Sequence, residues 1–254
     1  MLSEAQVAQY HEDGYVIPDY RIPDEALLEI RTAHDRLLAK HPEFRDYCAT
    51  LLAYDTSFLG TARTPEILDM VEQVIGPNFA LWNSSFFAKP SGNGKRTPWH
   101  QDGEYWPIRP LATCTVWIAV DAATPENGCL RIIKGSHKDR RLRKHNTVEA
   151  SDVTLHQELA PEEYDDSKAV DLELEAGQIS LHDVFLLHGS EANTSAHSRR
   201  GMTLRFMPTS SVFDRDVAVE MHHRLGITDH SARTLWLMRG KDASGGGNDF
   251  RLRL

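Results

Sequence analysis

The hydrophobic period of this chain changes at Gly76–Pro77, and that change limits the folds open to it. Before this point, apolar residues recur at helical spacing after Pro23–Asp24 and again after Thr64–Pro65. After it, short apolar or alternating runs are separated by Gly, Pro and Asn turns, as between strands. The chain is therefore expected to be mostly β with N-terminal helices, which favours a double-sheet jelly roll or barrel.

The individual elements follow from local signals. A capping box at Ser3 and Gln6 predicts a first helix that ends at Gly14. His41–Pro42 ends the second helix, and Gly76 ends the third. The expected strands are 15–17, 79–89, 111–121, 129–133, 169–174, 178–188 (one long strand or a pair) and 201–208. Residues 43–63 are expected to form a packed connection rather than a lid. Residues 135–164 are expected to form a surface excursion, and the tail from 210 is weakly patterned.

Length and composition indicate a single domain without a nucleic-acid or membrane partner. The 254 residues divide into a helical part (about 1–76), a jelly-roll core (about 77–210) and a tail (211–254). The net charge of −9 argues against the basic surface that nucleic acids and anionic membranes require. Three cysteines without CxxC spacing are typical of buried thiols in a reducing compartment. Without an apolar secretory or membrane-spanning run, the chain is expected to be cytoplasmic.

The segment Trp99–Gly103 carries the first sign of chemistry. His100 and Asp102 stand two residues apart, and in an extended segment such residues project to the same face. A further ligand is expected at His188, which ends an apolar strand just before a loop. His182 is its rival, because it shares the strand parity of His188. Gly189–Ser190, followed by an arginine at suitable spacing, favours His188.

Two histidines and one carboxylate form the ligand set of non-haem Fe(II) oxygenases. That set leaves coordination positions for a 2-oxo acid and for dioxygen. A co-substrate with a distal carboxylate also needs a cation, and the planar fork of arginine binds a carboxylate through two hydrogen bonds. Arg199 follows His188 by eleven residues, whereas its rival Arg200 has the parity of an apolar strand face.

In this order the residues resemble the phytanoyl-CoA dioxygenase family of Fe(II)- and 2-oxoglutarate-dependent oxygenases. The resemblance spans roughly residues 8–208 and is carried by Gly76–Asn78, Lys89–Pro90, Trp99–Gly103, Tyr105–Pro107, Glu126–Leu130, Lys134–Lys138, His188–Ser190, Asn193, Ser195 and Arg199. It implies a double-stranded β-helix (a jelly roll of the cupin type) with iron at one mouth. It assigns His100, Asp102 and His188 to the metal. Arg199 and Ser190 would bind the distal carboxylate of 2-oxoglutarate, with Trp117 and Ser85 lining the co-substrate.

The expected reaction is hydroxylation of a small-molecule metabolite, with dioxygen consumed and 2-oxoglutarate decarboxylated to succinate and CO2. Related halogenases lack the carboxylate that Asp102 provides, so the resemblance favours hydroxylation or desaturation over halogenation. Two alternatives stay open at this point. One is a cupin-like metalloenzyme that does not use 2-oxoglutarate and has no need of Arg199. The other is a non-catalytic binding protein on the same fold.

Residues near the metal motif are candidates for contact with the substrate. Tyr105 and Trp106 follow the motif directly and are expected to divide between core and substrate pocket. Arg109 is a third candidate, since with Lys95 and Arg96 it would meet an anionic substrate. Solvated loop charges are the favoured interpretation of these three cations. Among the other histidines, His34 is expected at the boundary of a helix face and His137 in a structural turn. The pair His222–His223 is expected in solvent.

Overall fold

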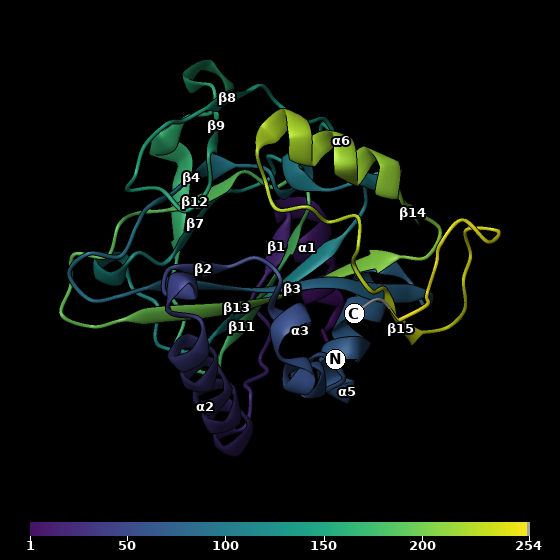
Figure 1. The fold of residues 1–254 in the computed structure, drawn as a ribbon, viewed down its shortest axis with the longest axis horizontal. Coiled ribbons are helices and arrows are strands. Elements are labelled where there is room, and N and C mark those ends of the chain that lie inside the picture. Colours follow the sequence, from purple (N-terminus) through teal and green to yellow (C-terminus); the bar gives the residue numbers. More distant parts are fainter. Residues whose placement is uncertain (253–254) are drawn as a thin grey trace.

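Two antiparallel β-sheets form the centre of the computed structural model, which describes residues 1–252 (Figure 1). The large sheet has the order β1-β11-β6-β13-β3-β15, with β2 paired to β3; its strands are β1 Tyr15–Val16, β2 Tyr47–Cys48, β3 Phe79–Lys89, β6 Cys114–Ala119, β11 Ile179–Asp183, β13 Arg199–Pro208 and β15 Trp236–Arg239. The small sheet has the order β10-β7-β12-β4, from β10 Ala169–Leu172, β7 Leu130–Ile133, β12 His188–Ser190 and β4 Thr97–His100. Two short pairs complete the strands, β8 His145–Thr147 with β9 Gln157–Leu159, and β5 Ile108–Arg109 with β14 Val212–Phe213. This architecture agrees with the expected jelly-roll class.

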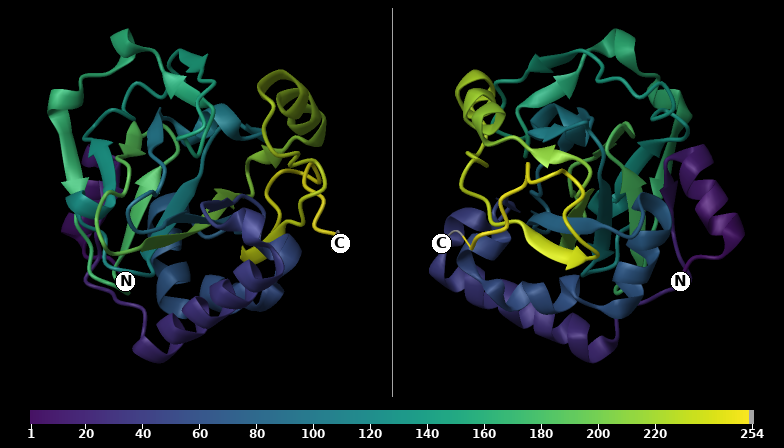
Figure 2. Two further views of the ribbon diagram at one scale, coloured as in Figure 1. Left: turned by 60° about the vertical axis from the view of Figure 1, so that its left-hand side comes forward. Right: turned by 90° about the vertical axis from the view of Figure 1, so that its right-hand side faces the viewer.

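The helices are α1 Glu4–Asp13, α2 Asp24–Lys40, the short α3 Leu51–Tyr54 and α4 Leu59–Ala62, α5 Pro65–Ile75, and α6 Arg215–Leu225 in the tail. Three of the helices, α1, α2 and α5, lie where the sequence predicted them, whereas α3, α4 and α6 were not predicted. The capping box at Ser3 is present, and Gly14 ends α1 with a φ of 84°, a conformation that suits glycine. Helices α2 and α5 lie against one face of the large sheet (Figure 2).

The large sheet has an outer face toward these helices and an inner face toward the small sheet. Along β13, Met202, Leu204 and Phe206 are fully buried in the core with the helices. Alternate residues point the other way, because side chains of a strand alternate between faces. Arg199 and Arg205 therefore lie on the inner face, where they line a cavity together with residues of the small sheet.

For 178–188 the structure has the strand pair rather than one long strand, and it differs from the expectations for the tail and for His34. Residues 178–188 form two strands in different sheets, β11 and β12, joined by a tight buried connection. The tail is more ordered than its weak pattern suggested, since α6 packs over the barrel and β15 extends the large sheet (Figure 2). His34 is not a boundary residue: it is fully buried on the outer face and stacks on Phe86 with ring centroids 4.0 Å apart.

Residues 43–63 form a packed connection of short helical turns, and β2 within it pairs with β3. The excursion 135–164 contains the β8–β9 hairpin. Along residues 1–252, no helix has the length and apolar character needed to cross a membrane.

Candidate active site

The register of the small sheet places two histidines side by side. His188 at the start of β12 is paired with His100 at the end of β4, and their ring centroids lie 4.2 Å apart. Asp102 follows in the 3-10 turn Asp102–Tyr105, and its Oδ1 lies 3.8 Å from His100 Nε2 and 3.9 Å from His188 Nε2. All three side chains are buried, and one ligand atom from each lies within 4.8 Å of the others. We call this group the His–Asp–His cluster.

The tautomers of both histidines suit a metal. His100 Nδ1 lies 2.7 Å from the carbonyl of Pro98, and His188 Nδ1 lies 2.9 Å from that of Leu186. A ring nitrogen that donates to a carbonyl carries the proton, which leaves the lone pair on Nε2. Burial and then the nearby His100 hold the pKa of His188 well below its usual value, so its ring is neutral. Two Nε2 atoms and one carboxylate oxygen therefore point at the same place.

The second oxygen of Asp102 is held from the large sheet. Thr115 donates to Oδ2 at 3.3 Å, and His182 Nε2 lies 3.5 Å from the same oxygen. Burial acts to raise the pKa of Asp102, yet the adjacent His100 and His182 hold it well below the usual carboxyl value. His182, the rival of His188, thus contacts the oxygen of Asp102 that faces away from the two cluster imidazoles. Such contacts fix the orientation of a ligand.

Arg199 is buried on the inner face of β13 and has no carboxylate partner among residues 1–252. It donates to the carbonyl of Gly128 from Nε at 3.1 Å and from Nη2 at 2.7 Å. A longer bond of 3.4 Å joins Nη2 to Ser190 Oγ, and the guanidinium carbon lies 5.5 Å from the Trp117 ring centroid. Burial lowers the pKa of Arg199 to about 10. The group is still a cation at neutral pH, and it is positioned to meet an anion.

Gly201 is required beside Arg199. A Cβ at this position would lie 2.3 Å from the Trp117 ring, which is closer than any side chain tolerates. The glycine therefore allows Trp117, on the neighbouring strand β6, to lie flat against β13. The predicted residues Arg199, Ser190 and Trp117 thus come together at one end of the barrel interior.

Two spaces flank Asp102 and Arg205, which line both. Toward Arg199 the space is narrow, about 30 Å³. On the other side a cavity of about 270 Å³ opens, which we call the side cavity. It is lined by Tyr47, Asn83, Phe87, Asp102, Tyr105, Trp106, Thr154, Leu155, His156, Arg205, Leu225, Gly226, Ile227, Thr228 and His230. Tyr105 and Trp106 line this cavity, as expected from their place after the metal motif, whereas the lining residues from the 135–164 excursion and the tail were not predicted.

Other predicted residues lie elsewhere. Arg109 is exposed and donates to the carbonyls of Trp106 and Ile108, so the structure does not bring it to the side cavity. Arg96 pairs with Glu158 at 2.7 Å, as expected of a solvated loop charge. Ser85 accepts a hydrogen bond of 2.5 Å from Arg205, which places it away from Arg199.

His137 has the structural role predicted for it, and Asn193 has a structural role as well. His137 Nε2 lies 3.1 Å from the carbonyl of His11, so it holds the end of α1 against the turn after β7. Asn193 donates to the carbonyls of Lys89 and His197, and its Oδ1 accepts from Ser195. Asn193 therefore fixes the loop after His188 through local bonds.

Gln101, between the two ligands of the Trp99–Gly103 motif, faces away from the cluster and anchors the motif. Its Nε2 donates to the carbonyls of Phe185 at 2.8 Å and Arg141 at 3.0 Å. Its Oε1 accepts from the backbone N–H of Arg143 at 2.7 Å. The segment 139–145 is therefore bonded directly to the metal motif, although the sequence predicted only a surface excursion.

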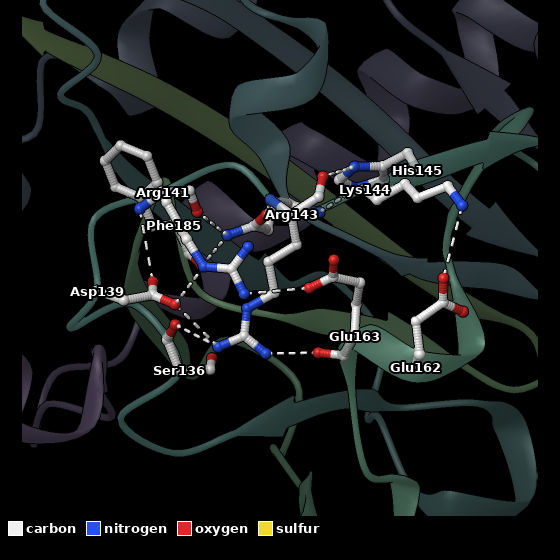
Figure 3. A network of polar contacts seen from close by, with 10 residues as sticks. Ser136, Asp139, Arg141, Arg143, Lys144, His145, Glu162, Glu163 and Phe185 are labelled. Atoms are coloured by element: carbon white, nitrogen blue, oxygen red, sulfur yellow. Dashed lines mark hydrogen bonds and ion pairs between the residues drawn. The ribbon is translucent and has the colours of Figure 1, made fainter.

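A polar network fixes that segment in turn (Figure 3). Arg143 donates to the carbonyl of Glu163 at 2.5 Å and to Asp139 at 3.3 Å. Arg141 bridges the same two residues, at 3.2 Å to each carboxylate. Exposed ion pairs each contribute little, but a network that shares partners restrains the backbone it spans. Gln101 is thus hydrogen-bonded to a segment, 139–145, that this network holds in place.

Comparisons with known proteins identify the family. The family model for phytanoyl-CoA dioxygenase (PhyH) matches residues 1–201. The peroxisomal phytanoyl-CoA dioxygenase of Bos taurus is 25% identical over 285 residues, which cover 96% of this chain and 83% of the relative. A phytanoyl-CoA dioxygenase domain-containing protein 1 homolog of Dictyostelium discoideum is 33% identical over 144 residues, which cover 56% of this chain and 51% of the relative. The chain belongs to the phytanoyl-CoA dioxygenase family.

Solved structures show the same fold. The apo form of the non-heme monooxygenase ThoJ superposes with a TM-score of 0.74 at 22% identity, covering 98% of this chain and 88% of that one. The epimerase SnoN, in complex with Fe3+, alpha ketoglutarate and nogalamycin RO, has a TM-score of 0.69 at 20% identity, covering 98% of each chain. Family membership and the His–Asp–His cluster together make this protein an Fe(II)- and 2-oxoglutarate-dependent non-haem oxygenase.

Proposed function

We propose that this oxygenase hydroxylates a small-molecule metabolite, with Fe(II) bound by His100, Asp102 and His188. The observation that carries the proposal is the convergence of two Nε2 atoms and one carboxylate oxygen in a buried site. Imidazole and carboxylate ligands in this ratio suit non-haem Fe(II) and leave room for further ligands. Both imidazoles are held through Nδ1, so the ligand atoms are oriented before any metal binds.

We further propose that Arg199 binds the distal carboxylate of 2-oxoglutarate, with Ser190 and Trp117 beside it. The support is the buried guanidinium, whose partners among residues 1–252 are carbonyls and a hydroxyl. A desolvated charge is costly unless an opposite charge reaches it, and a carboxylate supplies that charge with matching geometry. The space here is narrow, so the co-substrate must displace the long Arg199 contacts with Phe87 and Ser190. Ser85 hydrogen-bonds Arg205 and does not line the space beside Arg199, so we do not assign it to the co-substrate.

When bound together, iron, 2-oxoglutarate and dioxygen supply the oxidising chemistry, and succinate and CO2 leave. The chain's own residues orient the reactants and exclude water. Thr115 and His182 hold one oxygen of Asp102, so that the other faces the two imidazoles. The buried position of the cluster keeps bulk solvent away from the reacting atoms. Asp102 occupies the position that related halogenases leave open, which supports hydroxylation over halogenation.

The test is spectroscopic. Anaerobic protein loaded with Fe(II) should develop a visible metal-to-ligand charge-transfer band when 2-oxoglutarate is added. Succinate, which lacks the keto oxygen, is the matched control and should give no band. If iron loading is confirmed and 2-oxoglutarate still gives no band, the protein does not bind this co-substrate at the metal.

We also propose that the protein acts in the cytoplasm. Cys48, Cys114 and Cys129 are all free and buried, as in a reducing compartment. Some relatives are named as peroxisomal proteins, so fractionation of cells that express the tagged protein is the direct check. Recovery in the organelle pellet would contradict the proposal.

A further inference from the structure

The side cavity has an apolar wall and a cationic end. Phe87, Trp106, Leu155 and Ile227 form much of the wall. Of the described lining residues, Asp102 is the single carboxylate, and its ion pairs are with the histidines around the cluster. The cationic end therefore lies beside the cluster and forms no ion pair with a carboxylate among residues 1–252.

Arg205 forms that end. It lies on the same face of β13 as Arg199, six residues further on, or roughly 20 Å along the strand. Its side chain is 4% exposed. Nη1 donates to Ser85 Oγ at 2.5 Å, and the guanidinium carbon lies 5.1 Å from the Trp106 ring centroid. Its Nε is buried and has no hydrogen-bond partner within residues 1–252. Arg205 is thus a second desolvated cation with an unused donor.

Apart from Asp102, the residues that line the cavity around Arg205 add no negative charge. Asn83, its partner on β3, has a buried Oδ1 that also lacks a partner among residues 1–252. His230 lines the cavity, and its Nδ1 accepts from Arg233 Nη2 at 2.9 Å. Burial, and then Arg233, hold the pKa of His230 well below its usual value. The neutral ring therefore has its proton on Nε2, as a donor.

We propose that the side cavity binds the primary substrate, a small organic acid whose anionic group pairs with Arg205 and whose apolar body lies against the aromatic and aliphatic wall. This inference rests on the proposed function, because Asp102 lines the cavity and so places the acid beside the metal ligands. A cavity of about 270 Å³ is at the small end of ligand sites, which indicates a compact metabolite. A neutral molecule of the same shape would leave the guanidinium buried and unpaired, so the charge is the basis of selection.

A panel of fluorinated arylalkanoic acids, each matched with its primary amide, tests the proposal by 19F NMR. The protein is loaded with Mn(II) and saturating 2-oxoglutarate, which fills the Arg199 end and supplies a paramagnetic reporter at the cluster. Acids should bind at least about tenfold more tightly than their amides, and their signals should be broadened by Mn(II). Arg205→Gln should reduce this preference to about twofold or less.

Arg109→Gln is the matched control, since it removes the same charge from an exposed site and should keep the preference. If Arg205→Gln fails to fold, Arg205→Lys retains the charge without the planar fork and should keep only part of the preference. Equal binding of acids and amides to the wild type, or a preference unchanged in either Arg205 variant, would overturn the proposal. An Arg205-dependent preference without Mn(II) broadening would support the cavity's selectivity and contradict the metal assignment of the proposed function.

Discussion

The outer and inner faces of strand β13 have opposite properties. On the outer face, Met202, Leu204 and Phe206 are buried against the helices. On the inner face, Arg199 and Arg205 are buried without a carboxylate partner among the described residues. Burial of each apolar side chain stabilises the fold by about 1.5–3 kcal/mol, whereas a desolvated unpaired charge opposes folding. The outer face of β13 therefore stabilises the fold, whereas its inner face presents cations that ligands can pair with.

The adjacent arginines Arg199 and Arg200 show the same contrast one residue apart. Arg200 turns outward and pairs with Asp121 at 2.8 Å and Asp35 at 3.1 Å. Arg199 turns inward to carbonyls and a hydroxyl. The two side chains have the same chemistry, so it is the missing carboxylate that marks Arg199 as a ligand-binding group. A buried cation without its counter-ion is a better indicator of function here than a charged residue as such.

The largest expected effect concerns the two rival histidines, His188 and His182. His188→Ala should abolish succinate formation, because it removes a cluster Nε2. His182→Ala should retain iron binding and lose about 10–100-fold in activity, because it removes only support for Asp102. Iron content and succinate release measure both. Loss of iron in His182→Ala with iron retained in His188→Ala would exchange the two roles.

On the outer face, Leu204→Ala should lower the free energy of unfolding by about 2–5 kcal/mol, because it opens a cavity in a fully buried core. Denaturant unfolding measures this change. The folded fraction should keep the wild-type affinity for 2-oxoglutarate. A stable variant with weakened co-substrate binding would show that the two faces are not separate in function.

The arginine pair provides a matched comparison. Arg199→Ala should weaken 2-oxoglutarate binding about 10²-fold and leave Fe(II) binding intact, since one bidentate charged contact is lost. Arg200→Ala should leave the affinity for 2-oxoglutarate near the wild-type value. Titration of 2-oxoglutarate into Mn(II)-loaded protein, followed by calorimetry, gives the dissociation constant of the co-substrate for both variants. Equal loss of metal and co-substrate in Arg199→Ala would mean that its role is structural.

The smallest effect concerns the polar exception on the outer face. His34 is buried with both ring nitrogens unpaired among residues 1–252, and burial lowers its pKa from 6.5 to about 4. Between these values the unfolded chain takes up a proton that the folded protein does not, so stability is full above pH 6.5 and falls as the pH drops toward 4. From pH 7 to pH 5 this group should cost roughly 2 kcal/mol. In denaturant unfolding, His34→Leu should lose less stability over that range; an identical pH profile would contradict the assignment.

Much of the site was predictable because its signals are local. His100 and Asp102 share a face by spacing alone, and the run at 79–89 gave β3 its observed bounds. Strand parity was used for the pairs His188/His182 and Arg199/Arg200, and it carried further information. It separated Arg199 from Arg200, and the same parity places Arg205 on the inner face.

Beyond Asp102, Tyr105 and Trp106, the lining of the side cavity was not predictable, because it comes from segments with no local signature of a site. Residues 154–156 and 225–230 reach it through tertiary packing of the excursion and the tail. A position close to the metal motif in sequence did not ensure a position close to the cavity in space. Arg109 follows the motif within nine residues of His100, yet its guanidinium bonds to its own backbone on the surface.

The most direct test of the account is an anaerobic crystal structure of the protein with Fe(II) and 2-oxoglutarate. It should show the metal on His100 Nε2, Asp102 and His188 Nε2, with the distal carboxylate of 2-oxoglutarate on Arg199. The side cavity at Arg205 should stay free of the co-substrate. A metal bound by His182 in place of His188, or a 2-oxoglutarate carboxylate on Arg205, would contradict the roles assigned to these residues.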